Sequence, residues 1–244
     1  MKITFENVRY KNLLSSGNAW TTVTLDQNRT TLISGTNGSG KSTIIKEIIL
    51  DLLSKTEDRV GLISLEESVG DTAEKFIGMV LKKSLNEDTP PDEDELRQGF
   101  EQVFGDERLV LLDHQGSVGD DSLIDKIEYM ALMGCKYLVL DHITIAVSEG
   151  SDGLSGNEAI DKFMSDLLKI VKRHNIWLGL ISHLRKAQGG KAFEDGNIAS
   201  IDDIKGSGSI KQISFDIIAF SRNLTASDEY ERNTVQFRVL KSRF

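Results

Sequence analysis

A length of 244 residues favours one α/β domain. Acidic residues (38) outnumber basic ones (29), so the net charge is −9 and any nucleic-acid contact must come from a local patch of Lys and Arg. The single cysteine, Cys135, excludes an intramolecular disulfide framework and a multi-cysteine zinc site. No apolar run approaches the ~18 residues that a membrane span needs, and the start lacks the apolar stretch of a signal peptide.

The chain begins with a β-rich segment over residues 1–34 and continues as helices alternating with short apolar strands. After the strand TTLIS (30–34), further strands are predicted at 59–65, 108–113, 136–141, 176–182, 216–220 and 234–240. Helices are predicted at 41–54, 70–85 and 94–104, and around the apolar stripes that carry Leu123, Ile127 and Met130, and Phe163, Leu167 and Val171. Such alternation implies a mostly parallel sheet covered by helices on both faces, with ligands at the carboxyl ends of the strands.

The strongest motif is GTNGSGKST at 35–43, which follows a predicted strand and opens a predicted helix. It fits the G-x-x-x-x-G-K-[ST] pattern, in which backbone N–H groups surround a phosphate at a helix N-terminus. Lys41 would neutralise the β- and γ-phosphates, Ser42 would place its hydroxyl on Mg²⁺, and Thr43 would support it. The remaining nucleotide-binding positions of the loop are Gly35, Thr36, Asn37, Gly38, Ser39 and Gly40.

Acidic residues follow three of the predicted strands. A second carboxylate for Mg²⁺ or its waters is expected at a neighbouring strand end, and both Asp113 and Asp141 qualify. We prefer Asp141, because its strand is more tightly apolar. A residue that orients or deprotonates water is also needed, and Glu66 and Glu67 follow the strand after the phosphate-loop helix, where one could reach the γ-phosphate, although both could be surface acids.

Five segments together resemble the ATPase domain of phage primase–helicases, which are hexameric ring helicases with a RecA-like core. They are LEES (65–68), LVLDHI (138–143), LISHLRK (180–186), DDIKGSGSIKQISFDIIAFSRN (202–223) and LKSRF (240–244), in the order of the family's motifs. The resemblance covers about residues 50–244. It implies a RecA-like α/β ATPase core over 35–244, on which the β-rich segment 1–34 packs within one compact domain.

The resemblance also implies roles for individual residues. Glu66 matches the catalytic base, Asp141 the second acidic motif and His183 the γ-phosphate sensor, beside Lys41 in the catalytic set. Arg243 matches an arginine finger offered to the next subunit's nucleotide. Gln212 matches a coupling residue, Arg222 a nucleotide-side contact, and Lys241 lies beside the finger. The DNA-facing positions are Arg185, Lys186, Lys191, Lys205 and Lys211.

The function implied is an ATP-dependent DNA helicase motor that hydrolyses ATP between subunits and moves on single-stranded DNA in phage-type replication. ATP and Mg²⁺ are the expected cofactors. A ring-shaped homo-oligomer, a primase or polymerase partner and the cytoplasm of a bacterial host are expected with it.

Two alternatives remain open. Residues 1–47 are similar to the start of SMC-type recombination-nuclease ATPases, but the closest approach to that class's signature, GLSGNE (153–158), follows the second acidic motif. His142 stands where that class has a catalytic glutamate. A non-catalytic, nucleotide-binding interaction protein is the other alternative. ATP turnover with and without single-stranded DNA separates the three.

Overall fold

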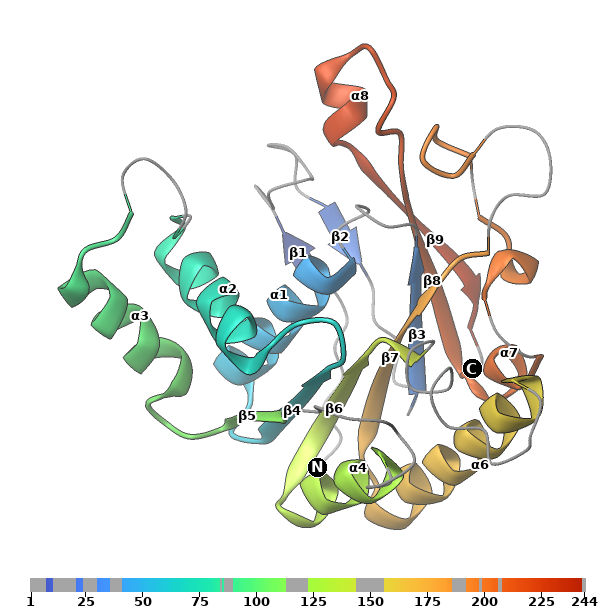
Figure 1. Cartoon of the computed structure of the whole chain (residues 1–244), viewed down its shortest axis with the longest axis horizontal. Coiled ribbons are helices and arrows are strands. Elements are labelled where there is room, and N and C mark those ends of the chain that lie inside the picture. Colours follow the sequence, from blue (N-terminus) through green and yellow to red (C-terminus); the bar gives the residue numbers. More distant parts are fainter. Residues whose placement is uncertain are drawn as a thin grey trace.

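A seven-stranded sheet forms the centre of the molecule in the computed structural model (Figure 1). The strand order is β5-β4-β6-β7-β3-β8-β9, and all neighbours pair in parallel except β8 and β9, which are antiparallel. The structure describes residues 8–10, 21–23, 30–35, 41–83, 85, 90–112, 123–143, 156–185, 192–197, 199–205 and 208–242. The parallel pairing of six of the seven strands confirms the mostly parallel sheet predicted from the sequence.

The strands of this sheet fall close to the predicted positions. They are β3 (Thr30–Gly35), β4 (Arg59–Ser64), β5 (Leu109–Leu112), β6 (Cys135–Asp141), β7 (Trp177–His183), β8 (Asp216–Arg222) and β9 (Val235–Lys241). Two short strands, β1 (Val8–Tyr10) and β2 (Thr21–Val23), pair with each other in a separate antiparallel sheet beside α1. Strand β3 lies inside the main sheet, although most of it belongs to the segment 1–34. The division of the chain into a segment 1–34 and a core 35–244 stays a prediction.

Helices cover both faces of the sheet. They are α1 (Lys41–Lys55), α2 (Val69–Leu81), α3 (Glu93–Phe104), α4 (Leu123–Leu132), α6 (Gly156–His174), α7 (Gly208–Ile213) and α8 (Glu229–Asn233), with a 3₁₀ turn at Ile201–Asp203. Helices α1, α2 and α3 pack on one face, and α4, α6 and α7 on the other (Figure 1). The 3₁₀ turn, α7 and α8 were not predicted, since each is at most two turns long and carries too few apolar residues to show a period.

Alternating side chains of the central strands supply the core on each face. On β6, Leu138 and Leu140 belong to the cluster of α4 and α6, whereas Val139 belongs to the cluster of α1. Both sides of the strand are therefore apolar, as expected for a parallel strand buried on two faces. In the part of the chain that the structure describes, no helix combines the length and apolar character that crossing a membrane requires.

Local signals explain where several helices begin. The N-cap of α3 is Asp92, whose side chain accepts from the Glu95 N–H while the Glu95 side chain accepts from the Asp92 N–H. This capping box satisfies two backbone donors that a helix start leaves open. Helix α2 begins after its N-cap Ser68, whose hydroxyl oxygen accepts from the Asp71 N–H at 3.1 Å. The β4–α2 connection is thereby fixed at its C-terminal end.

Candidate functional site

The carboxyl ends of four neighbouring strands bring the predicted phosphate-site residues together. Strand β3 leads toward α1, and its last residue, Gly35, is in register with His183 at the end of β7. Likewise Ser64 at the end of β4 is in register with Asp141 at the end of β6. The Leu65 N–H donates to the Asp141 carbonyl at 2.6 Å, which holds the β4–α2 turn against β6.

Lys41 and Ser42 lie in the first turn of α1, at the end of the helix where the dipole favours anions. Lys41 is 7% exposed. Burial lowers its pKa from the ordinary 10.5 to about 8, although the nearby carboxylates of Asp141 and Glu66 act to raise it. Thr43 follows in the same turn, and Gly35 ends β3. The loop positions Thr36, Asn37, Gly38, Ser39 and Gly40 lie outside the described residues.

Asp141 is a buried carboxylate at the end of β6, and it shares a side-chain hydrogen bond with Ser42. Burial raises the pKa of Asp141 above its usual range, while the Ser42 hydrogen bond and the charge of Lys46 act to lower it. The hydroxyl and the carboxylate thus converge in front of the helix N-terminus. Oxygen ligands of this kind are the set that Mg²⁺ prefers, so these residues fit the cation.

The alternative carboxylate, Asp113, lies outside the described residues, but its strand does not. Strand β5 is at the edge of the sheet, four strands from β3, whereas β6 is two strands from β3. The phosphate loop follows β3, so the sheet order supports the preference for Asp141.

Glu66 lies beside two histidines. His142 Nε2 and Glu66 Oε1 are hydrogen-bonded at 2.7 Å, and His183 Nε2 is 3.9 Å from the same oxygen. The two imidazole rings meet edge to face with centroids 4.0 Å apart. Burial, together with the positive charge of Lys41, lowers the pKa of His183 to about 4, so its imidazole is neutral at pH 7. The sequence motifs assign no role at this site to His142, and only its position directly after Asp141 signals it.

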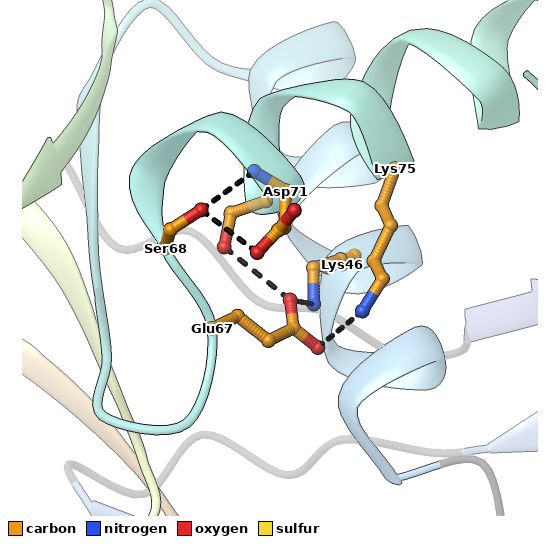
Figure 2. Close-up of polar contacts among 6 residues, drawn as sticks. Lys46, Glu67, Ser68, Asp71 and Lys75 are labelled. Carbon is orange, nitrogen blue, oxygen red and sulfur yellow. Dashed lines mark hydrogen bonds and ion pairs between the residues drawn. The ribbon is translucent and has the colours of Figure 1, made fainter.

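Glu67 points toward α1 and α2, where it lies between Lys46 and Lys75 (Figure 2). Its Oε2 accepts from Lys46 Nζ of α1 at 3.0 Å and from the Thr72 hydroxyl at 3.3 Å, and its Oε1 accepts from Lys75 Nζ at 2.7 Å. Lys46 is only 2% exposed. Burial acts to raise the pKa of Glu67, but the Lys75 hydrogen bond and the Lys46 charge outweigh it and lower the pKa. The structure thus separates the two glutamates that sequence alone left as alternatives.

The other predicted nucleotide-side residues lie toward the C-terminus. Arg222 ends β8, two residues beyond Phe220, which is in register with Gly35, and its Nε donates to the Arg232 carbonyl at 2.5 Å. Lys241 Nζ donates to the carbonyls at the C-terminal end of α7, with Ser214 O at 2.8 Å, Gln212 O at 3.3 Å and the Lys211 carbonyl as a third acceptor. The Gln212 side chain is exposed on α7. Arg243 lies outside the described residues.

The predicted DNA-facing residues divide into two groups. Arg185 and Lys205 are both exposed and lie on paired segments, because the Lys205 N–H donates to the His183 carbonyl and the Arg185 N–H donates to the Asp203 carbonyl. Lys211 on α7 forms an ion pair with Asp202 at 2.8 Å. Lys186 and Lys191 lie outside the described residues. Arg185 follows two residues after His183, and Lys205 is hydrogen-bonded to the His183 backbone, so both basic residues lie next to the His183 end of the phosphate site.

Known proteins resemble this chain in sequence and in fold. No family model matches the chain. A DNA helicase/primase of Enterobacteria phage T3 is 35% identical over 224 residues, which cover 87% of this chain and 38% of the phage protein. The chain therefore spans less than half of that relative.

Two solved structures share the fold. One is described as the ATPase domain of G40P, with a TM-score of 0.69 and 16% identity over 88% of this chain and 77% of that chain. The other is a DnaB-like replicative helicase solved for its interactions with primase, with a TM-score of 0.68 and 16% identity over 88% of this chain and 54% of that chain. The resemblance found in the sequence is confirmed: this chain has the RecA-like fold of replicative-helicase ATPase domains and is similar to the corresponding part of a phage DNA helicase/primase.

Proposed function

We propose that this chain is an ATP-hydrolysing motor domain that moves on single-stranded DNA in phage-type DNA replication. One observation carries the proposal: Lys41, Ser42, Glu66, Asp141 and His183 meet at the carboxyl edge formed by β3, β7, β6 and β4. This is where ligands bind in open α/β sheets. The similarity to a phage DNA helicase/primase supports the same function.

Each side chain has a role that follows from its chemistry. The Lys41 ammonium would neutralise the β- and γ-phosphates, and Asp141 and Ser42 would hold Mg²⁺, which neutralises developing charge on the phosphate oxygens. The Glu66 carboxylate, 48% exposed, would accept a proton from the attacking water. Since the His183 imidazole is neutral, it could donate a hydrogen bond to the γ-phosphate and relay its loss toward the adjoining basic segment.

DNA would be held on the surface that begins at Arg185 and Lys205, together with Lys186, Lys191 and Lys211. Such contacts to the phosphate backbone bring little base preference. If all five engage one strand, the slope of log affinity against log salt would be roughly −3 to −4, at ~0.7 per phosphate. Lys211 would first exchange Asp202 for a phosphate, a small cost because surface ion pairs stabilise by about 1 kcal/mol or less.

Assembly completes the proposal. Arg243 would act as an arginine finger on the nucleotide of the next subunit of a ring, with Gln212, Arg222 and Lys241 near that interface. A primase or polymerase partner and the cytoplasm of a bacterial host fit a replication motor of this kind.

The test is ATP binding and turnover of the purified chain, with and without single-stranded DNA. Lys41→Ala should abolish tight Mg-ATP binding with little change in fold, because it removes the ammonium from the phosphates. Lys55→Ala is the matched control, since Lys55 lies on the same helix with its side chain 54% exposed and paired to Asp51. Unchanged affinity in Lys41→Ala would refute the phosphate site. Tight ATP binding by the wild type without DNA-stimulated turnover would favour the interaction protein.

A further inference from the structure

Glu66, His142 and His183 form a cluster with the composition of a metal site. Each residue offers one ligand atom within 4.8 Å of the other two. Glu66 Oε1 is common to both measured contacts, at 2.7 Å from His142 Nε2 and 3.9 Å from His183 Nε2. The three side chains come from different elements: the β4–α2 turn, the end of β6 and the end of β7.

We propose that these three side chains bind a borderline transition-metal cation, with Zn²⁺ as the natural example. Two ligands on one tetrahedral zinc lie ~3.3 Å apart when the bonds are ~2.0–2.1 Å long. This separation falls between the two measured distances, so each contact needs to change by only about 0.6 Å. His142 and His183 would bind through their Nε2 lone pairs, with the imidazole protons on Nδ1.

The ligand set selects the class of cation. Two imidazoles and one carboxylate suit zinc and its neighbours, whereas Mg²⁺ prefers oxygen ligands and retains several waters. The cluster is therefore distinct from the oxygen pair of Ser42 and Asp141. Glu66 is half-exposed and His183 partly so, whereas His142 is buried, which leaves one open side for the ion and for a water as fourth ligand.

The surrounding charges allow a divalent cation. Lys41 and Lys205 contribute positive charges that face His183, and both oppose binding. The carboxylates of Glu66 and Asp141 contribute two negative charges on the same side of the sheet. The two carboxylates offset the charges of the two lysines, so no net positive charge opposes the cation.

The consequence for activity rests on the proposed function. A bound Zn²⁺ would occupy the Glu66 carboxylate that accepts the proton of water and the His183 imidazole that contacts the γ-phosphate. Zinc would therefore inhibit ATP hydrolysis, and removing it would restore hydrolysis. Binding itself does not depend on the proposed function, because the ligands are present in the nucleotide-free protein.

The experiment titrates the nucleotide-free 244-residue chain with ZnCl₂ by calorimetry, with Mg²⁺ in excess. The titration is repeated with Co²⁺, whose visible absorption reports four-coordinate geometry. We expect one ion per chain in the wild type and at least tenfold weaker binding in His142→Asn and His183→Asn. His174→Asn is the matched control, because His174 also contacts a glutamate, Glu128 at 3.0 Å, and should bind zinc as the wild type does.

Each result decides the proposal. No binding by the wild type, or unchanged binding in both His142→Asn and His183→Asn, overturns the site. His142 is buried and its variant could misfold, so His183→Asn, checked by circular dichroism, carries the decision alone if needed. Zinc that binds without slowing wild-type ATP hydrolysis overturns the inhibitory role. A wild type that binds zinc but never hydrolyses ATP leaves the metal site standing and overturns the proposed function instead.

Discussion

Replacing Glu67 by glutamine should destabilise the fold, although Glu67 is next to the proposed catalytic base. The substitution keeps the shape of the side chain and removes its charge. Lys46 Nζ, 3.0 Å from the carboxylate, would then be a buried ammonium that has lost its closest anion. Removing one partner from a buried ion pair typically costs about 3–5 kcal/mol.

We expect the lower end of that range, about 3 kcal/mol, because the charge of Asp141 continues to attract Lys46. The second ion pair of Glu67 adds little, since the Lys75 side chain is 52% exposed and such surface pairs are worth about 1 kcal/mol or less. For a chain of this size, a loss of about 3 kcal/mol lowers Tm by roughly 6–12 °C.

The measurement compares urea unfolding curves of Glu67→Gln, Lys75→Ala and Glu66→Gln with the wild type. Glu66→Gln should change stability by less than about 1 kcal/mol, since Glu66 is half-exposed. It should nevertheless bind ATP and fail to hydrolyse it, because an amide cannot accept the proton. The apolar substitution Lys46→Met added to Glu67→Gln should recover much of the lost stability.

The pH dependence provides an independent check. The pKa of Glu67 is lowered in the folded chain, so the folded state releases this proton more readily than the unfolded state. Its stabilising contribution is complete above the ordinary value of 4.5 and is lost as the pH falls through the lowered value. Glu67→Gln should lack this acid-dependent loss. A Glu67→Gln variant that is as stable as the wild type but dead in hydrolysis would refute the reasoning and make Glu67 the base.

Three further predictions follow from the site and its surroundings. Between pH 8 and 10.5 the unfolded chain holds the Lys41 proton that the folded chain has lost, so the free energy of unfolding should rise with pH by at most about 3 kcal/mol. Urea unfolding at stepped pH measures this rise, and Lys41→Met should remove it. Lys241→Met should cost about 2 kcal/mol in the same assay, because the carbonyls at the end of α7 lose a charged donor. The double variant Arg185→Ala/Lys205→Ala should bind oligonucleotides of unrelated sequence more weakly, and to the same extent, in filter-binding assays. The slope of log affinity against log salt should become shallower by about 1.4, and an unchanged slope would show that DNA is held elsewhere.

The strands and long helices could be predicted because each carries a strong local period. The helix predicted at 41–54 is α1 at Lys41–Lys55, and the strand predicted at 136–141 is β6 at Cys135–Asp141. Strand order could not be read from such patterns. In particular, β3 lies between β7 and β8, two strands that come more than 140 residues later, and only the tertiary structure reveals this.

The residue types of the candidate site could be predicted from the sequence, but the direction in which each side chain points could not. The phosphate-loop motif identified Lys41 and Ser42, since its spacing and context are specific. His142 was missed because a histidine after an aspartate has no distinctive spacing of its own. Lys46 was missed because it lies on the apolar face of α1, where a lysine is expected only if it is paired, and its partner Glu67 is 21 residues away.

The two adjacent glutamates show how stability and catalysis depend on one turn. Glu66 hydrogen-bonds His142 whereas Glu67 hydrogen-bonds Lys46, so only Glu66 of the pair contacts the histidines of the phosphate site. Lys46 and Thr72 hold Glu67 against α1 and α2, and the Leu65 N–H is fixed to the Asp141 carbonyl. With both flanking residues fixed, Glu66 is directed toward His142 and His183. The buried ion pair of Glu67 with Lys46 therefore orients the proposed catalytic carboxylate of Glu66. Weakening that ion pair should slow ATP hydrolysis only indirectly, to the extent that the β4–α2 turn becomes less ordered.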